Sequence, residues 1–92
     1  MRPVAHEDPQ QVIRDVGRRI SEIRSGLGLT QEQVAERLGM TLKGYQFIER
    51  GVQNLTIKTM VRVASALEVR TAELFAAPAS REVRRGRPRK TS

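Results

Sequence analysis

The stretch from Thr30 to Gly51, TQEQVAERLGMTLKGYQFIERG, constrains the fold more than any other part of the chain. It predicts two short helices joined by a tight turn. Thr30 followed by Gln33 has the spacing at which two side chains satisfy the free backbone N–H groups at a helix start. Gly39 can adopt the left-handed backbone that ends a helix, and Thr41 can cap the next helix.

The two predicted helices should share an apolar inner surface. Ala35 is small at the place where two steeply crossing helices come closest, and a larger side chain there would push them apart. The predicted inner residues are Val34, Ala35, Leu38, Tyr45 and Ile48.

Length and composition predict one all-α domain. With 92 residues, 38% of them hydrophobic, the chain can build one modest core. The sequence is poor in aromatic residues and rich in Leu, Ala, Glu, Gln and Arg at helical spacing. No Cys is present, which excludes disulfides and thiolate metal sites. No apolar run approaches the roughly 20 residues that span a bilayer, and the N-terminus lacks the apolar core of a signal peptide. We therefore expect a cytoplasmic protein, nucleoid-associated if bacterial, with no membrane partner.

The positive charge is concentrated near the C-terminus. The net charge is +7, and residues 76–92 contribute six basic residues and one acidic residue, +6 − 1 = +5, which leaves +2 for residues 1–75. A basic chain favours a polyanionic partner. Most of the non-specific attraction would come from the tail.

Three regions follow along the chain. Residues 1–7 predict a disordered arm, in which His6 is interpreted as solvated and not as a metal ligand or pH sensor. Residues 8–76 form the folded domain, and residues 77–92 predict a flexible tail. Asp8 and Pro9 are a capping residue and a first helical residue, and they start a helix that runs to about Ser25.

We expect a compact five-helix domain. In the first helix, Gly17 marks either close packing or nothing. Thr56 should cap a fourth helix, and Thr71 a last turn in which Leu74 and Phe75 close the core. The predicted inner residues of the fourth helix are Ile57, Met60, Val61, Ala64 and Leu67.

The sequence has no arrangement of residues typical of catalysis. Carboxylates lie mostly beside Arg or Lys, no glycine-rich phosphate loop follows a strand, and no His pair has the spacing of metal ligands. We therefore expect no enzyme activity, no cofactor and no metal site.

The chain resembles the phage repressor and Cro type of helix-turn-helix domain, the XRE family. The resemblance rests on LGLTQEQVAERLG and IERG, on the buried and turn positions of Thr30 to Gly51, and on NLTIKTMVRVASALEVRTAELF downstream. It covers roughly residues 12–75. It implies a DNA-binding domain whose third helix lies in the major groove while the first turn of the second helix contacts a phosphate.

The resemblance also implies roles for individual residues. Lys43 can donate to guanine, Gln46 can pair with adenine, and Leu42 or Phe47 can meet a thymine methyl group. The implied base-reading residues are Thr41, Leu42, Lys43, Gln46 and Phe47. The implied phosphate contacts are Thr30, Gln31, Arg50, Gln53, Asn54 and Lys58. Arg24 and Glu49 occupy positions where family members often place a buried ion pair, which would fix the pitch of the third helix. The alternative is that they are two solvated charges.

The sequence departs from the family pattern in ways that leave a second function open. Gly44 weakens the third helix or permits close approach to DNA. Leu42 and Phe47 would form an exposed apolar face, which could instead bind a protein. The alternative function is therefore an interaction module, such as an antitoxin or adaptor.

The tail is similar to an AT-hook, in which a Gly-Arg-Pro core lies in the minor groove of A·T-rich DNA. Arg84 stands where the hook usually begins with Pro, and an unspecific electrostatic tail is the alternative. The implied minor-groove residues are Arg84, Arg85, Gly86, Arg87, Pro88, Arg89 and Lys90.

These observations together predict a sequence-specific DNA-binding transcriptional regulator, acting as a homodimer on an inverted repeat. A restriction-modification controller and a phage-type repressor are the two regulatory circuits open to it, and they differ in circuit rather than in chemistry.

Overall fold

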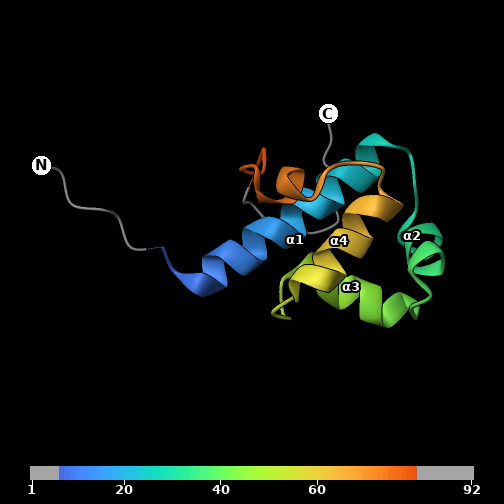
Figure 1. The fold of residues 1–92 in the computed structure, drawn as a ribbon, viewed down its shortest axis with the longest axis horizontal. Helices are drawn as coiled ribbons and strands as arrows, with labels where there is room; N and C mark the ends of the chain where they lie inside the picture. The colour runs from blue at the N-terminus through green and yellow to red at the C-terminus, as the bar shows by residue number, and fades with distance from the viewer. Residues whose placement is uncertain (1–6, 81–92) are drawn as a thin grey trace, which may run out of the picture.

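The computed structural model describes residues 7–80 as four α-helices followed by one short 3₁₀ turn (Figure 1). The helices are α1 (Pro9–Gly26), α2 (Gln31–Leu38), α3 (Leu42–Arg50) and α4 (Ile57–Ala66), and the turn is η1 (Thr71–Phe75). Most of the predicted arm, residues 1–6, and the whole AT-hook-like segment lie outside the described residues.

Each α-helix begins at the residue that the sequence predicts. The Asp8 side chain accepts from the Gln10 backbone N–H, and Thr41 and Thr56 accept from the N–H groups of the third helical residues after them. At α2 the predicted capping box is confirmed: Thr30 Oγ1 accepts from Gln33 N at 3.0 Å, and Gln33 Oε1 accepts from Thr30 N at 2.8 Å. Gly39 ends α2 with φ 68°, as predicted.

The core lies where the helices meet. It contains all five predicted inner residues of α2 and α3, together with Val16 and Ile20 from α1 and Leu74 from η1. α3 lies along the lower edge of the domain in Figure 1, and its inner face packs against α1 and α2. Its other face is therefore open.

The prediction of five helices is wrong. The segment Thr71–Phe75 is a single 3₁₀ turn with backbone hydrogen bonds from Glu73 to Arg70 and from Ala76 to Glu73. No side chain caps it, because Thr71 is its first residue and not its N-cap. This five-residue segment has no capping side chain and is followed three residues later by Pro78. It is long enough for the two hydrogen bonds of a 3₁₀ turn but too short to continue as an α-helix.

Three residues predicted to lie in the core, Ile57, Val61 and Phe75, are exposed instead. Ile57 and Val61 are 67% and 46% exposed, and Val63 is buried in their place. Both choices keep helical spacing with Met60, Ala64 and Leu67, so that periodicity alone does not fix how α4 is rotated. Phe75 is 54% exposed, whereas its neighbour Leu74 closes the core.

The chain continues in contact with α1 after η1. The backbone N–H groups of Ala79 and Ser80 donate to the carboxylate of Glu22, with Ala79 N at 2.8 Å from Oε2. Arg19 of the same helix donates to the Glu73 carbonyl oxygen at 3.1 Å. These contacts attach η1 and the residues up to Ser80 to α1.

Candidate nucleic-acid interface

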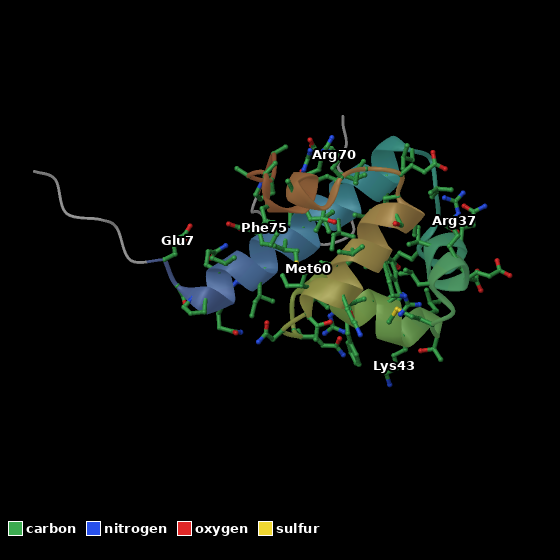
Figure 2. All side chains as sticks on the ribbon, in the orientation of Figure 1. Glu7, Arg37, Lys43, Met60, Arg70 and Phe75 are labelled. Carbon is green, nitrogen blue, oxygen red and sulfur yellow. The ribbon has the colours of Figure 1, made fainter. Side chains whose placement is uncertain are left out.

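The outward surface of α3 combines exposed polar groups with partly covered ones. Thr41, Leu42 and Lys43 are exposed, whereas Gln46 and Phe47 are half-buried. Figure 2 shows the Lys43 side chain projecting away from the body of the domain. The first turn of α3 is therefore the most accessible part of this surface.

Phe47 is not the exposed residue that the sequence predicts. It is half-buried, and the guanidinium carbon of Arg50 lies 5.7 Å from its ring centroid, within cation–π range. A ring that is already covered on one side offers less apolar area for a protein partner. The predicted Leu42/Phe47 face is consequently smaller than expected.

The electrostatic character of this region is positive. From Gly39 to Leu67 the chain has four basic residues and one acidic residue, +4 − 1 = +3. The acidic residue is Glu49, whose side chain is only 6% exposed and is paired with Arg24. No carboxylate therefore opposes the cations on the surface of this segment.

Two exposed arginines bind backbone carbonyl groups of neighbouring helices. Arg37 of α2 donates to the Ala66 carbonyl oxygen near the end of α4, and Arg62 of α4 donates to the Leu38 carbonyl oxygen at the end of α2. These side chains satisfy helix-terminal carbonyls. Within residues 7–80, by contrast, Lys43 and Lys58 form no hydrogen bond or ion pair with the protein, and both are exposed.

The remaining candidate phosphate ligands cluster around α2 and the start of α4. In the described part of the chain, the backbone N–H groups of Gln31 and Glu32, at the first turn of α2, have no acceptor on the protein. Such groups, at the positive end of a helix dipole, suit a phosphate. Gln53 and Asn54 are exposed in the loop between α3 and α4. The hydroxyl oxygen of Thr30 is already an acceptor in the capping box.

Arg24 and Glu49 form an ion pair between α1 and α3. Arg24 Nε lies 2.6 Å from Glu49 Oε2 and Nη2 lies 3.3 Å from Oε1, while Nη1 donates to the Leu29 carbonyl oxygen at 2.7 Å. Burial lowers the pKa of Arg24, but Glu49 more than offsets this and the pKa is raised overall. The pair joins the end of α1 to the last turn of α3.

Two further side chains complete the partners of Glu49. The hydroxyl group of Tyr45, which is fully buried, donates to Glu49 Oε2, and burial together with this carboxylate raises the pKa of Tyr45. Gln31 Nε2 donates to Glu49 Oε1 at 2.9 Å, and Gln46 Nε2 donates to Gln31 Oε1 at 3.0 Å. The four-residue spacing from Tyr45 to Glu49 was available in the sequence as a helical contact, whereas the contact between Gln31 and Gln46 has no sequence signal.

Residues 7–80 contain neither a metal site nor a membrane-spanning helix. No group of three His, Asp or Glu side chains in this range could hold a metal ion. No helix in the same range has the length and apolar character needed to cross a membrane.

The sequence is similar to a helix-turn-helix family and to several of its members. The HTH_3 helix-turn-helix family matches residues 20–74. An uncharacterized HTH-type transcriptional regulator from Archaeoglobus fulgidus is 32% identical over 57 residues, which are 62% of this chain and 81% of the relative.

Solved structures of two restriction-modification controller proteins have a similar fold. C.AhdI from Aeromonas hydrophila matches with a TM-score of 0.65 and 32% identity, over 68% of this chain and 96% of C.AhdI. C.Esp1396I, solved as a tetramer in complex with its natural 35-base-pair operator, matches with a TM-score of 0.64 and 33% identity, over 70% of this chain and 84% of C.Esp1396I.

Proposed function

The chain belongs to the HTH_3 helix-turn-helix family, and from this premise we propose that it acts as a sequence-specific DNA-binding transcriptional regulator. One observation carries the DNA-binding part of this proposal. The open surface of α3 and the start of α4 present free cations, while the only carboxylate between Gly39 and Leu67 is buried in an ion pair. A surface of this kind attracts phosphate groups and does not repel them.

The proposed mechanism places α3 in the major groove. Lys43 would donate to guanine O6 or N7, Gln46 would pair with adenine, and Leu42 would contact a thymine methyl group, with Thr41 and Phe47 at the margins. The phosphates on either side would be held by the first turn of α2 and by the region that follows α3. The residues proposed for this second role are Thr30, Gln31, Arg50, Gln53, Asn54 and Lys58.

The alternative, a protein-interaction module, has less support. It depends on an apolar face at Leu42 and Phe47, and Phe47 is half-buried beneath Arg50. Lys is depleted at the centre of known protein–protein interfaces, whereas the Lys43 side chain projects outward from α3. A half-buried Phe47 and an outward-projecting Lys43 therefore fit a DNA groove better than a protein partner.

We further propose that the protein binds an inverted repeat as a homodimer. C.Esp1396I has been solved as a tetramer on its operator, so association of subunits on DNA occurs in a structural relative. In this chain Ile57, Val61 and Phe75 are large apolar side chains left exposed by the fold. Ile57 and Phe75 line the same surface pocket, and contiguous exposed apolar area of this kind marks interaction surfaces.

Selection of bound sequences from a random duplex pool tests the base-reading assignment. Lys43→Ala and Gln46→Ala should each lower discrimination at one or two base pairs by about 1–3 kcal/mol, because each removes one base contact. An enriched palindrome in the wild-type selection would support the dimer.

Arg70→Ala is the matched control for this selection. Arg70 is exposed and also lies on the side of the domain away from Lys43 (Figure 2). Its replacement removes one positive charge without touching the proposed groove surface, and the selected sequence should not change. If Lys43→Ala and Gln46→Ala select the same sequence as Arg70→Ala and the wild type, α3 does not read the bases.

Removal of residues 81–92 tests the contribution of the tail. The deleted segment holds six basic residues, Arg81, Arg84, Arg85, Arg87, Arg89 and Lys90, and the cut after Ser80 preserves the contacts with Glu22. Affinity should fall for all sequences, and the slope of log K against log salt should flatten by about 0.9 for each phosphate that the tail neutralises in the full-length protein. A preference for A·T-rich flanks present only in the full-length protein would support the minor-groove assignment of Arg84 to Lys90. An unchanged slope would exclude any role of the tail in DNA binding.

A further inference from the structure

We propose that Gln31 is a positioning residue that decides which hydrogen-bonding groups Gln46 presents to a DNA base, and that Glu49 sets the orientation of both amides. This inference rests on the proposed function, since it concerns how α3 would read a base. It starts from a continuous series of contacts: Glu49 Oε1 accepts from Gln31 Nε2 at 2.9 Å, and Gln31 Oε1 accepts from Gln46 Nε2 at 3.0 Å.

The orientation of Gln31 follows from the chemistry of Glu49. A glutamine amide has two ends of opposite character, because its NH₂ group donates and its oxygen accepts. The carboxylate of Glu49, paired with Arg24, can only accept. Gln31 must therefore turn its NH₂ group toward Glu49, since the reverse orientation would place two acceptors against each other.

The same reasoning determines Gln46. With its NH₂ group turned inward, Gln31 has only its oxygen to offer on the other side, so Gln46 must present an N–H to it. One N–H and the oxygen of Gln46 then remain unused. These are the two groups needed to donate to adenine N7 and to accept from adenine N6.

These hydrogen bonds fix which end of the Gln46 amide donates and which end accepts. An unrestrained amide can rotate by half a turn and exchange its donor and acceptor, and it also samples several rotamers before binding. Here both side chains are half-buried and held by direct contacts to a carboxylate that is itself fixed by Arg24 and Tyr45. Binding groups held in place in this way lose less freedom on association and discriminate better between ligands.

Gln31→Met tests this proposal directly, because methionine is similar in length and lacks the amide. In the random-pool selection, Gln46→Ala should lower the preference at its base pair by roughly 5- to 150-fold. Gln31→Met should lower the preference at that same base pair by roughly 2- to 13-fold, the cost of ordering one free side chain on binding, although residue 31 itself faces Glu49 and not a base. Thermal unfolding followed by circular dichroism establishes that each variant is folded.

Gln53→Met is the matched control, because Gln53 is an exposed glutamine proposed to contact a phosphate and is not in the series. It should weaken binding to all sequences equally. If Gln31→Met behaves like Gln53→Met, with uniform weakening and unchanged base preference, Gln31 is only a phosphate contact and the inference is wrong while the proposed function stands. If Gln46→Ala leaves the selected sequence unchanged, Gln46 reads no base, and both the inference and that part of the proposed function are overturned.

Discussion

Replacing Gly17 with alanine is expected to lower the free energy of unfolding by about 1–3 kcal/mol, the usual effect of forcing an extra methyl group into a packed contact. A Cβ atom at this position would lie 2.6 Å from the Glu49 carbonyl oxygen and 2.7 Å from that of Ile48. Both are backbone atoms of α3, so the strain can be relieved only by moving the helix. The direction is opposite to helix propensity, which favours alanine over glycine by about 1 kcal/mol.

Gly26→Ala provides the control in the same helix. A Cβ atom at Gly26 would meet nothing within 4 Å, and the substitution should be neutral or stabilising by up to about 1 kcal/mol. Urea unfolding of the two variants measures the difference. Equal stability of Gly17→Ala and Gly26→Ala would mean that α1 and α3 do not approach each other as closely as the structure has them.

The close contact at Gly17 belongs to a row of contacts that orients α3. At one end, Gly51 has φ +69° and no side chain, and a Cβ atom there would lie 2.7 Å from the Cα atom of Arg14. At the other end, Arg24 holds Glu49. Contacts at Arg14, Gly17 and Arg24 are spaced along α1, so that α1 fixes both the distance and the pitch of the proposed reading helix.

Features that depend on neighbours in the sequence could be predicted. The starts of all four α-helices follow from Asp8, Thr30, Thr41 and Thr56, because a cap is a contact between residues two or three apart. The inner faces of α2 and α3 were predicted correctly for the same reason, since each short helix carries a single well-defined apolar stripe.

Features that depend on tertiary contacts could not be predicted in the same way. The sequence of α4 contains two overlapping apolar stripes, and only packing against the other elements decides that Val63 is buried while Ile57 and Val61 are exposed. The interpretation of Gly17 was left open between close packing and no role, and the carbonyl groups opposite it decide for close packing.

In the candidate site, too, the local features could be predicted from the sequence and the tertiary contacts could not. The resemblance implied the outward position of Lys43 on α3, because that position depends only on where the residue falls in the local helix-turn-helix motif. By contrast, the hydrogen bond between Gln31 and Glu49 joins residues 18 positions apart, and the one between Gln31 and Gln46 joins residues 15 positions apart. Such contacts depend on how α2 and α3 cross, and a polar side chain on a helix surface carries no sign of its partner.

Replacing Arg24 with methionine is expected to lower the free energy of unfolding by about 3–5 kcal/mol, because it leaves the carboxylate of Glu49 buried without its counter-ion. The substitution removes two hydrogen bonds to Glu49 and the one to the Leu29 carbonyl oxygen. The Glu49 side chain is 6% exposed and the Arg24 side chain is 14% exposed, so that water can replace little of these interactions. Urea unfolding followed by circular dichroism gives the value directly.

The double variant Arg24→Met, Glu49→Met separates the cost of the stranded charge from the other roles of the pair. Replacing both members of a buried ion pair with apolar residues is often close to neutral, and the remaining deficit should be about 1–3 kcal/mol, the cost of leaving the Tyr45 hydroxyl without an acceptor. A double variant as unstable as Arg24→Met would show that the unpaired charge is not the cause. The double variant should nevertheless have a weaker base preference than the wild type at the position read by Gln46, because Gln31 then has no carboxylate to orient its amide. Random-pool selection with this folded double variant therefore tests whether the ion pair serves specificity independently of stability.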